Sequence, residues 1–250
     1  MRKAVMLARR TLAICQTCKG RLWQAKETVA ENLAEQERFR RENILSIVNT
    51  IVSYNCPDDS GSWFLENFFE EVRQKKLAIL VVQNKDPYFH IPRVKNLAHR
   101  LGIIAGANYL LNLDIDNFVA QEDLKILQEL SGKGLAYHGL ENMRDGSCGR
   151  IGLPVDEFVA AGGYDEACGF SGKHDLKLVE FLKKSVGVSR HNPSKRAIQN
   201  SKELTRRFSP NNTAENDSGL LQERAGLDVS LTCRIKGVLY YGSRGVEMEL

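Results

Sequence analysis

Short apolar runs alternate with longer segments of helical pattern along most of this chain, and this alternation constrains the fold more than any other feature. The run at 44–54, ILSIVNTIVSY, is rich in β-branched residues and is typical of a buried strand. The segment at 22–42 instead places its apolar residues at helical spacing. Strands separated by helices pair side by side, and the helices cover both faces of the sheet. We therefore expect an α/β fold with a mostly parallel central sheet.

The expected elements follow one another without an internal repeat. Strands are expected at 11–16, 44–54, 77–83, 109–113, 134–138 and 150–153, and helices at 22–42, 63–75, 93–101, 121–130 and 175–184. A terminal hairpin is expected from the strand pattern at 229–241. The segment SPNNTAENDSG at 209–219 has almost no apolar side chains to bury, so we expect a mobile loop there.

Length and composition fit one globular domain in a reducing compartment. A chain of 250 residues is long enough to bury a full core without disulfides. The sequence has no apolar stretch of about 18 residues that would predict a transmembrane helix, and charged residues interrupt the apolar stretch after its basic start. Six thinly spread cysteines suit reduced thiols better than a disulfide framework. These features predict a soluble, cytoplasmic protein.

Cys15 and Cys18 form one C-x-x-C pair, a spacing that can bind zinc or support thiol chemistry. The sequence has no second pair of this kind to complete a zinc site. Cys15 also falls inside an expected buried strand, where cysteine is a common small apolar residue. We therefore interpret the pair as part of the core.

Basic residues concentrate in one window, Leu182–Arg207, although the net charge of the whole chain is only +4. The window opposes eight basic residues to a single acid, Glu203. The eight are Lys183, Lys184, Arg190, Lys195, Arg196, Lys202, Arg206 and Arg207. Such an excess favours an anionic partner, such as phosphates or nucleic acid. A solvated helix face explains the same pattern, so both interpretations stay open.

An apolar strand pattern, YLLNL at 109–113, runs directly into Asp114-Ile115-Asp116. Ligands of parallel α/β sheets bind at the carboxyl ends of the strands, so these carboxylates are expected in a binding site. Two acids at this spacing can hold a divalent cation that keeps part of its water and bridges phosphate oxygens. The same residues could instead cap a following helix, because Asp and Asn are good N-caps.

Four segments, in this order, resemble those of the GT-A glycosyltransferases of the family 2-like, D-x-D type, which use nucleotide-sugar donors. They are KNLAHR at 95–100, similar to the family's R/K-N-x-A/G helix; LLNLDIDN at 110–117, similar to its strand that runs into D-x-D; GRIGLP at 149–154 with GGYDE at 162–166, similar to its acceptor-side segment; and GKHDL at 172–176, similar to its G-x-E-D-x-D-L helix start. The resemblance runs from about Thr11 to Lys184 and does not cover the tail beyond Arg190.

The resemblance implies a GT-A nucleotide-diphospho-sugar transferase fold, with a mostly parallel central sheet and helices on both faces. Residues 1–190 would form the catalytic domain. Residues 191–250 would supply the basic segment, the mobile loop and the terminal hairpin, packed on the same domain.

The resemblance also implies a metal site in this hexosyltransferase-type enzyme. Asp116 would ligate Mn²⁺ or Mg²⁺, and Asp114 would bind the metal through water or face the donor ribose. His191, which follows the expected catalytic region, would be a third metal ligand. The ion would neutralise the diphosphate leaving group as the glycosidic bond breaks.

The donor, taken to be a UDP-sugar, would lie against residues from three parts of the chain. They are Thr17 and Arg21 after the first strand, Asp58 and Asp59 after the second, and Asn96 and Arg100 in the helix at 93–101. After the second strand this chain reads VSYNCPDD where the family has V-D-D-G-S.

Proton removal from the acceptor falls to Asp175 by the same resemblance. A carboxylate suits this role because one proton must leave as the acceptor oxygen attacks the sugar. The family has an acid just before this position, where this chain has His174, the next candidate for the base. Asp175 could instead be a helix N-cap.

Two acceptor classes stay open. One group of GT-A-like phage enzymes, associated with TET-type oxygenases, glycosylates hydroxymethylated bases in DNA. A soluble, basic chain suits 5-hydroxymethylcytosine in DNA as acceptor, because basic residues supply phosphate contacts, and such an enzyme would act in the host cytoplasm. A cell-surface saccharide or lipid acceptor is the alternative. Apart from the choice of acceptor, a nucleotide-sugar binding protein without transfer activity is the alternative to an enzyme.

Overall fold

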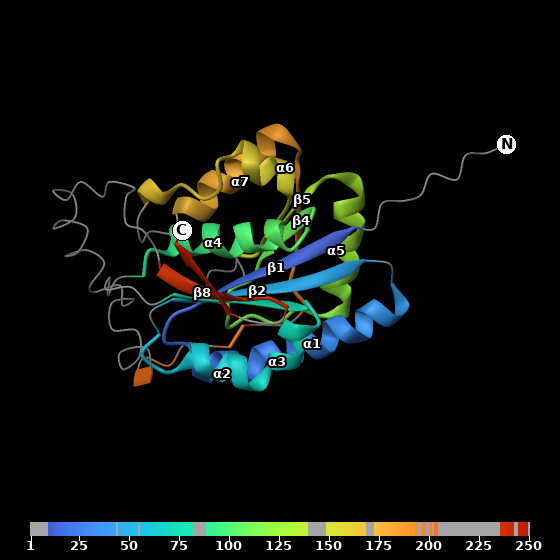
Figure 1. Cartoon of the computed structure of the whole chain (residues 1–250). Coiled ribbons are helices and arrows are strands. Elements are labelled where there is room, and N and C mark those ends of the chain that lie inside the picture. The colour runs from blue at the N-terminus through green and yellow to red at the C-terminus, as the bar shows by residue number, and fades with distance from the viewer. Residues whose placement is uncertain are drawn as a thin grey trace.

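The computed structural model describes residues 10–43, 45–54, 56–82, 89–139, 149–168, 173–194, 197–198, 201, 203–204, 236–242 and 245–249. These residues form three layers, in which a central β-sheet lies between two groups of helices (Figure 1). The order of strands and helices along the chain produces the α/β arrangement that the sequence predicts.

The described strands form one nine-stranded sheet, in the spatial order β7-β5-β6-β4-β1-β2-β3-β8-β9. Their bounds are β1 Thr11–Cys18, β2 Ser46–Tyr54, β3 Leu77–Val82, β4 Tyr109–Asn112, β5 Ala136–Gly139, β6 Ile151–Pro154, β7 Val188–His191, β8 Lys236–Tyr240 and β9 Gly245–Glu249. β6 and β8 run against their neighbours, and the other strands share one direction. The strand order reverses between β1 and β4, so ligands are expected at the carboxyl ends of these two strands.

The helices divide between the two faces of the sheet (Figure 1). One face carries α4 Ile91–Ile104, α6 Val155–Ala160 and α7 Lys173–Ser185, and the other carries α1 Leu22–Glu42, α2 Ser60–Asn67, α3 Phe69–Arg73 and α5 Gln121–Lys133. A 3₁₀ turn, η1, covers Glu166–Cys168. None of the helices in the described ranges has the length and apolar character needed to cross a lipid bilayer.

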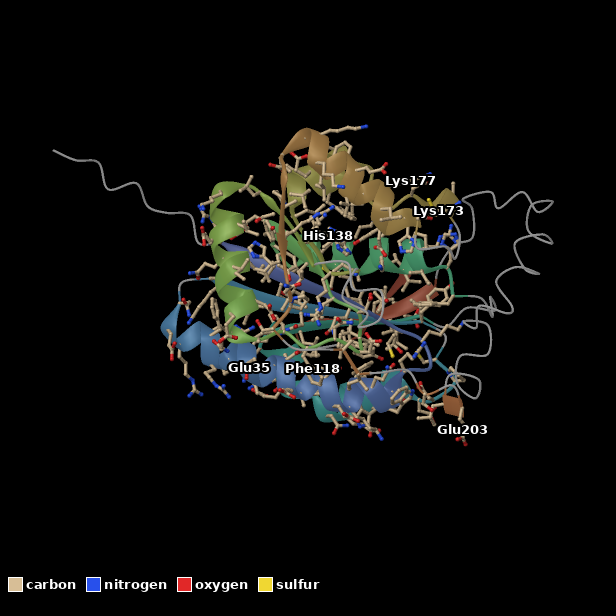
Figure 2. All side chains as sticks on the ribbon, turned by 180° about the vertical axis from the view of Figure 1, so that it is seen from behind. Glu35, Phe118, His138, Lys173, Lys177 and Glu203 are labelled. Atoms are coloured by element: carbon tan, nitrogen blue, oxygen red, sulfur yellow. The ribbon has the colours of Figure 1, made fainter. Side chains whose placement is uncertain are left out.

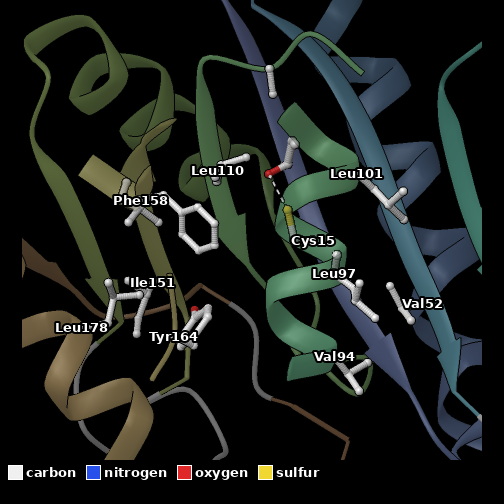
Figure 3. Close-up of a cluster of buried hydrophobic side chains, with 14 of the residues drawn as sticks. Cys15, Val52, Val94, Leu97, Leu101, Leu110, Ile151, Phe158, Tyr164 and Leu178 are labelled. Atoms are coloured by element: carbon white, nitrogen blue, oxygen red, sulfur yellow. Dashed lines mark hydrogen bonds between the residues drawn. The ribbon is translucent and has the colours of Figure 1, made fainter. Parts of the chain in front are cut away.

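Alternate residues of β1 pack into the cores on opposite faces of the sheet. Ala13 and Cys15 contact the α4 side, and Figure 3 shows Cys15 against this helix. Ile14 packs on the side of α1 and α5. Cys18 lies in a further cluster beneath α1 and α2, so the C-x-x-C cysteines point to different cores. Both thiols are fully buried, which agrees with their interpretation as core residues.

The expected helix at 63–75 is in fact two helices, α2 and α3, and the first begins earlier, at Ser60. The break falls at Phe68, whose backbone leaves the helical region with φ −127° and ψ 27°. The Phe68 ring packs edge-on against Trp63, with ring centroids 5.5 Å apart. Burial of this ring in the core therefore overrides the helical pattern of the sequence.

Two elements, α6 and β7, were not expected from the sequence, because each is too short to show a periodic pattern. The terminal hairpin also lies later in the chain than expected. Its strands are β8 and β9, and the chain turns at Gly242, where φ is +92°, rather than within 229–241. The expected mobile loop at 209–219 lies outside the described residues.

Candidate active site

Asp114 and Asp116 follow β4 on a turn whose backbone is fixed from several sides. The N–H of Asn117 donates to the Asp114 carbonyl over 2.9 Å. Ile115, between the two acids, is buried, and its carbonyl accepts a hydrogen bond from the Thr28 hydroxyl over 2.6 Å. Because this turn is anchored in the core, its two acids stay at the carboxyl edge of the sheet, where the strand order reverses.

The two carboxylates of the D-x-D turn destabilise each other's negative charge. Burial raises the pKa of Asp116 above its usual range, and the charge of Asp114 raises it further. The guanidinium of Arg21 and a 2.6 Å hydrogen bond from the Asn117 amide act in the opposite direction. Two acids held together in this way favour the binding of a cation.

Lys95 of α4 lies between the D-x-D turn and α7. Its Nζ lies 2.9 Å and 3.2 Å from the two carboxylate oxygens of Asp175, and 3.9 Å from Oδ1 of Asp114. The Lys95 side chain is only 4% exposed. We did not assign a role to Lys95 from the sequence. The available signal was its position at the start of the KNLAHR segment, one of those that carry the resemblance.

Asp175, in the first turn of α7, shares the Lys95 ammonium with Asp114 of the D-x-D turn. Its side chain is 18% exposed, whereas that of the neighbouring His174 is almost fully buried. His174 lies with Nε2 3.4 Å from Oδ2 of Asp175, and its ring packs edge-on against Tyr164. Access therefore favours Asp175 over His174 as the predicted base, and both assignments stay predictions.

Asn96 and Arg100, expected at the diphosphate, do not face the D-x-D turn. The buried Asn96 amide is taken up by hydrogen bonds to the Tyr164 backbone and to Glu166. Arg100 is exposed, and its place five positions after Lys95 turns it to a different side of α4. Their contact with a diphosphate stays a prediction that the present arrangement does not favour.

The residues expected on the donor side differ in exposure and in bonding. Oδ2 of Asp58 accepts the N–H of Leu22 over 2.9 Å, at the start of α1. Oδ1 of the same carboxylate is buried and has no hydrogen-bond partner within the described residues. Thr17, near the end of β1, is half-buried, and Asp59 is exposed. A buried oxygen without a partner is costly, so a ligand that donates an N–H there would stabilise the site.

His191, at the end of β7, makes its contacts with Ser189 and Tyr137. Its Nε2 lies 2.8 Å from the Ser189 hydroxyl, and its ring stacks on Tyr137 at 5.7 Å. Tyr137 belongs to the core on the α5 side, whereas Asp114 contacts Lys95 on the α4 side. In the part of the chain that the structure describes, no three His, Cys, Asp or Glu side chains are arranged to hold a metal ion.

Comparisons by sequence find no counterpart: no family model matches the chain, and no curated protein matches it. Comparisons by structure do. The structure of S. aureus TarS residues 1–349 in complex with UDP covers 88% of this chain and 67% of that chain, with 11% identity and a TM-score of 0.53. The structure of S. aureus TarS also covers 88% of this chain but only 40% of that one, with 11% identity and a TM-score of 0.54.

The likeness to these structures concerns the fold. It confirms the prediction of a GT-A nucleotide-diphospho-sugar transferase fold with a large central sheet between helices. The D-x-D turn lies close to Arg21, and Asp175 of α7 lies close to Asp114 through Lys95; that these residues bind a donor stays a prediction.

Proposed function

We propose that this chain is a metal-dependent glycosyltransferase that moves a sugar from a UDP-sugar donor to an acceptor hydroxyl group. The observation that carries the proposal is the meeting of Asp114 and Asp175 at one buried lysine, with Asp116 beside Asp114, where the strand order reverses. Such a transfer needs a charge that stabilises the leaving diphosphate and a separate group that removes a proton. The UDP-bound TarS structure, which has the same fold, supports the choice of UDP.

The D-x-D carboxylates fit a hard divalent cation, Mn²⁺ or Mg²⁺. Asp116 and Asp114 would hold it, since carboxylate oxygens are preferred ligands and the mutual repulsion of the two acids would be relieved. A bound ion would supply positive charge to the departing diphosphate. Ions of this kind commonly complete their coordination with water and phosphate oxygens, so the site does not depend on His191.

The donor would lie along the ends of β1 and β2. Oδ1 of Asp58, which no described residue hydrogen-bonds, suits an N–H donor on the nucleotide base, and Thr17 borders the same end of β1. Arg21, whose guanidinium senses the charges of Asp116 and Asp114, would attract the diphosphate. These contacts favour an intact nucleotide diphosphate over a simple sugar phosphate.

In the transfer step, Asp175 would accept the proton of the acceptor hydroxyl group. The acceptor oxygen forms a bond to C1 of the sugar while its proton passes to the Asp175 carboxylate. The bond between C1 and the diphosphate oxygen breaks, and its electron pair leaves with the nucleoside diphosphate. His174 is buried beside Asp175 and would contact the Asp175 carboxylate rather than the acceptor.

A donor-hydrolysis screen tests the proposal without knowledge of the acceptor. UDP-, GDP- and dTDP-sugars are incubated with the protein and Mn²⁺, and release of the nucleoside diphosphate is measured. We expect slow release from a UDP-sugar that stops with EDTA and in the Asp116→Ala variant. Nucleotide binding without any release would instead identify a nucleotide-sugar binding protein.

The acceptor proposal concerns the basic window Leu182–Arg207. Of its basic residues, Lys183, Lys184 and Arg190 lie in the described part and are exposed, and the other five lie outside it. We propose 5-hydroxymethylcytosine in DNA as acceptor, with a cell-surface saccharide or lipid as the alternative. If about four of these residues contact phosphates, log K for duplex DNA should fall against log[salt] with a slope of roughly −3 to −4.

Radiolabelled donor distinguishes the acceptor classes. Label on hydroxymethylcytosine-containing DNA but not on plain DNA would support DNA as the acceptor. A lack of DNA binding even at low salt would exclude DNA and leave the saccharide or lipid acceptor.

A further inference from the structure

The Lys95 ammonium group joins two acids that come from distant parts of the chain. Asp175, on α7, accepts from it with both carboxylate oxygens, at 2.9 Å and 3.2 Å. Asp114, after β4, lies 3.9 Å away. The proposed function places Asp114 on the donor side of the reaction and Asp175 on the acceptor side. One cation therefore spans the two halves of the candidate site.

The Tyr164 ring restricts where the Lys95 ammonium can go. The ammonium lies over the Tyr164 ring, 5.3 Å from its centroid. Tyr164 is in turn fixed by the amide of Asn96, the residue next to Lys95. The flexible Lys95 side chain is thus held in one place by its neighbours. It has already lost the conformational entropy whose loss normally weakens lysine ion pairs.

Burial of the Lys95 ammonium requires that its charge be balanced by acidic groups. At 4% exposure its charge has little contact with water, so it must be compensated by nearby acids. Among the described residues, Asp175 is the acid that lies within hydrogen-bond distance of Lys95 through both oxygens. The same pair therefore neutralises the lysine and holds the Asp175 carboxylate in one orientation.

We propose that Lys95 is the positioning residue for Asp175. It orients the Asp175 carboxylate toward the reacting centre, and its contact with Asp114 fixes where that carboxylate lies relative to the D-x-D turn. This inference rests on the proposed transferase function. In its simplest form, with water as acceptor, the water oxygen bonds to C1 of the donor sugar and its proton passes to Asp175. The bond from C1 to the diphosphate oxygen breaks, and the nucleoside diphosphate leaves with the electron pair.

A purely structural ion pair is the competing explanation, and α7 offers a matched control for it. Lys177, two residues after Asp175, pairs with Asp165 at 2.6 Å. That pair is largely exposed, at 57% and 39%, and Figure 2 shows Lys177 on the outer side of α7. Lys177→Met removes a lysine–aspartate pair that α7 makes with Asp165, without changing a residue of the proposed reaction centre.

The test is a double-mutant cycle read out by hydrolysis of the UDP-sugar that the wild type cleaves best. The variants are Lys95→Met, Asp175→Asn, the double variant and Lys177→Met, each checked for folding by circular dichroism. We expect Lys95→Met to lower kcat on the order of 10²-fold and to leave KM for the donor near the wild-type value. The double variant should be no slower than Asp175→Asn alone, because Lys95 acts through that carboxylate. Lys177→Met should match the wild type.

The outcomes separate the inference from the proposed function. A double variant that is slower than Asp175→Asn by the full factor of Lys95→Met would show independent action and overturn the positioning role. So would an increase in KM with kcat retained, which would make Lys95 a donor-binding residue. If Lys95→Met does not fold, the comparison of the double variant with Asp175→Asn still decides, because removal of both charges leaves neither one buried alone. If the wild type hydrolyses no nucleotide sugar, the proposed function fails, and this inference fails with it.

Discussion

The Asn96 side chain hydrogen-bonds both backbone groups of Tyr164: Oδ1 accepts the N–H over 2.8 Å, and Nδ2 donates to the carbonyl over 2.9 Å. Residue 163 must be glycine for this contact, because a Cβ there would lie 2.6 Å from Oδ1 of Asn96 and φ is +79°. The Asn96 amide therefore attaches the GGYDE segment to α4, and Arg93 adds an ion pair with Glu166. This attachment places Tyr164 beneath Lys95.

Asn96→Ala should lower the free energy of unfolding by about 2 kcal/mol, because it leaves two buried backbone groups of Tyr164 without partners. Urea unfolding measures this loss. Arg100→Ala, an exposed change on the same helix, serves as control and should be nearly neutral. Unchanged stability of Asn96→Ala together with lost UDP binding would instead support the diphosphate contact expected from the sequence.

The parts of the site that depend on local pattern were predictable. Asp114 and Asp116 directly follow an apolar strand pattern, so the sequence predicts them at the carboxyl edge of the sheet, where they lie. The partners of Lys95 and Asn96 are much harder to read, because Asp175 and Tyr164 lie 80 and 68 positions away in the chain. Nothing in the spacing of residues within α4 indicates which tertiary contact each will make.

The differences in the fold have similar causes. β7 was not expected, so the contact of the His191 ring with Tyr137 could not be foreseen either, and the metal-ligand role of His191 stays a prediction. When a strand is too short to be predicted from the sequence, the face of the sheet to which each of its side chains points cannot be predicted either. The helix expected at 63–75 was broken by the packing of Phe68 on Trp63, a tertiary contact that helical periodicity does not reveal.

Asp116→Ala should abolish metal-dependent donor hydrolysis without unfolding the protein. The loss follows from the missing metal ligand, whose effect on the leaving diphosphate is worth several kcal/mol. Stability should be retained, because burial and the charge of Asp114 already disfavour the ionised Asp116. Nucleoside diphosphate release and thermal unfolding are measured side by side, with the exposed Glu122→Ala as control. Full activity in Asp116→Ala, or in the presence of EDTA, would contradict metal dependence.

Two glycine-to-alanine substitutions should affect different properties, one the activity and the other the stability. At Gly149 an added Cβ would lie 2.8 Å from Oδ2 of Asp114, the end of a movable side chain. At Gly102 it would lie 2.6 Å from Cβ of Ala13 in the core. Gly149→Ala should therefore displace the carboxylate and lower donor hydrolysis with little loss of stability. Gly102→Ala should destabilise the fold by roughly 1–3 kcal/mol through overpacking. Urea unfolding and hydrolysis on both variants test this, and equal stability losses would contradict it.

His99 should make the stability of this protein depend on pH in mildly acidic solution. Burial lowers the pKa of its imidazole to about 4, from the 6.5 that is usual for histidine. The Lys95 ammonium also lowers it, while the hydrogen bond to the Lys95 carbonyl and the charge of Asp175 act in the opposite direction. Nε2 is buried without a hydrogen-bond partner among the described residues, so a protonated ring would carry an unsatisfied N–H there.

The sign follows from proton counting. Between pH 6.5 and 4 the unfolded chain binds a proton at His99 that the folded chain does not, so the stabilisation is complete above pH 6.5 and is lost as the pH falls toward 4. The full loss is on the order of 3 kcal/mol. His99→Phe keeps a ring that can stack on Phe158 but removes the titrating group. Urea unfolding at several pH values should show a stability difference between wild type and variant that shrinks or reverses as the solution is acidified. A difference that stays constant from pH 7 to about 4.5 would show that His99 is not held neutral in the folded state.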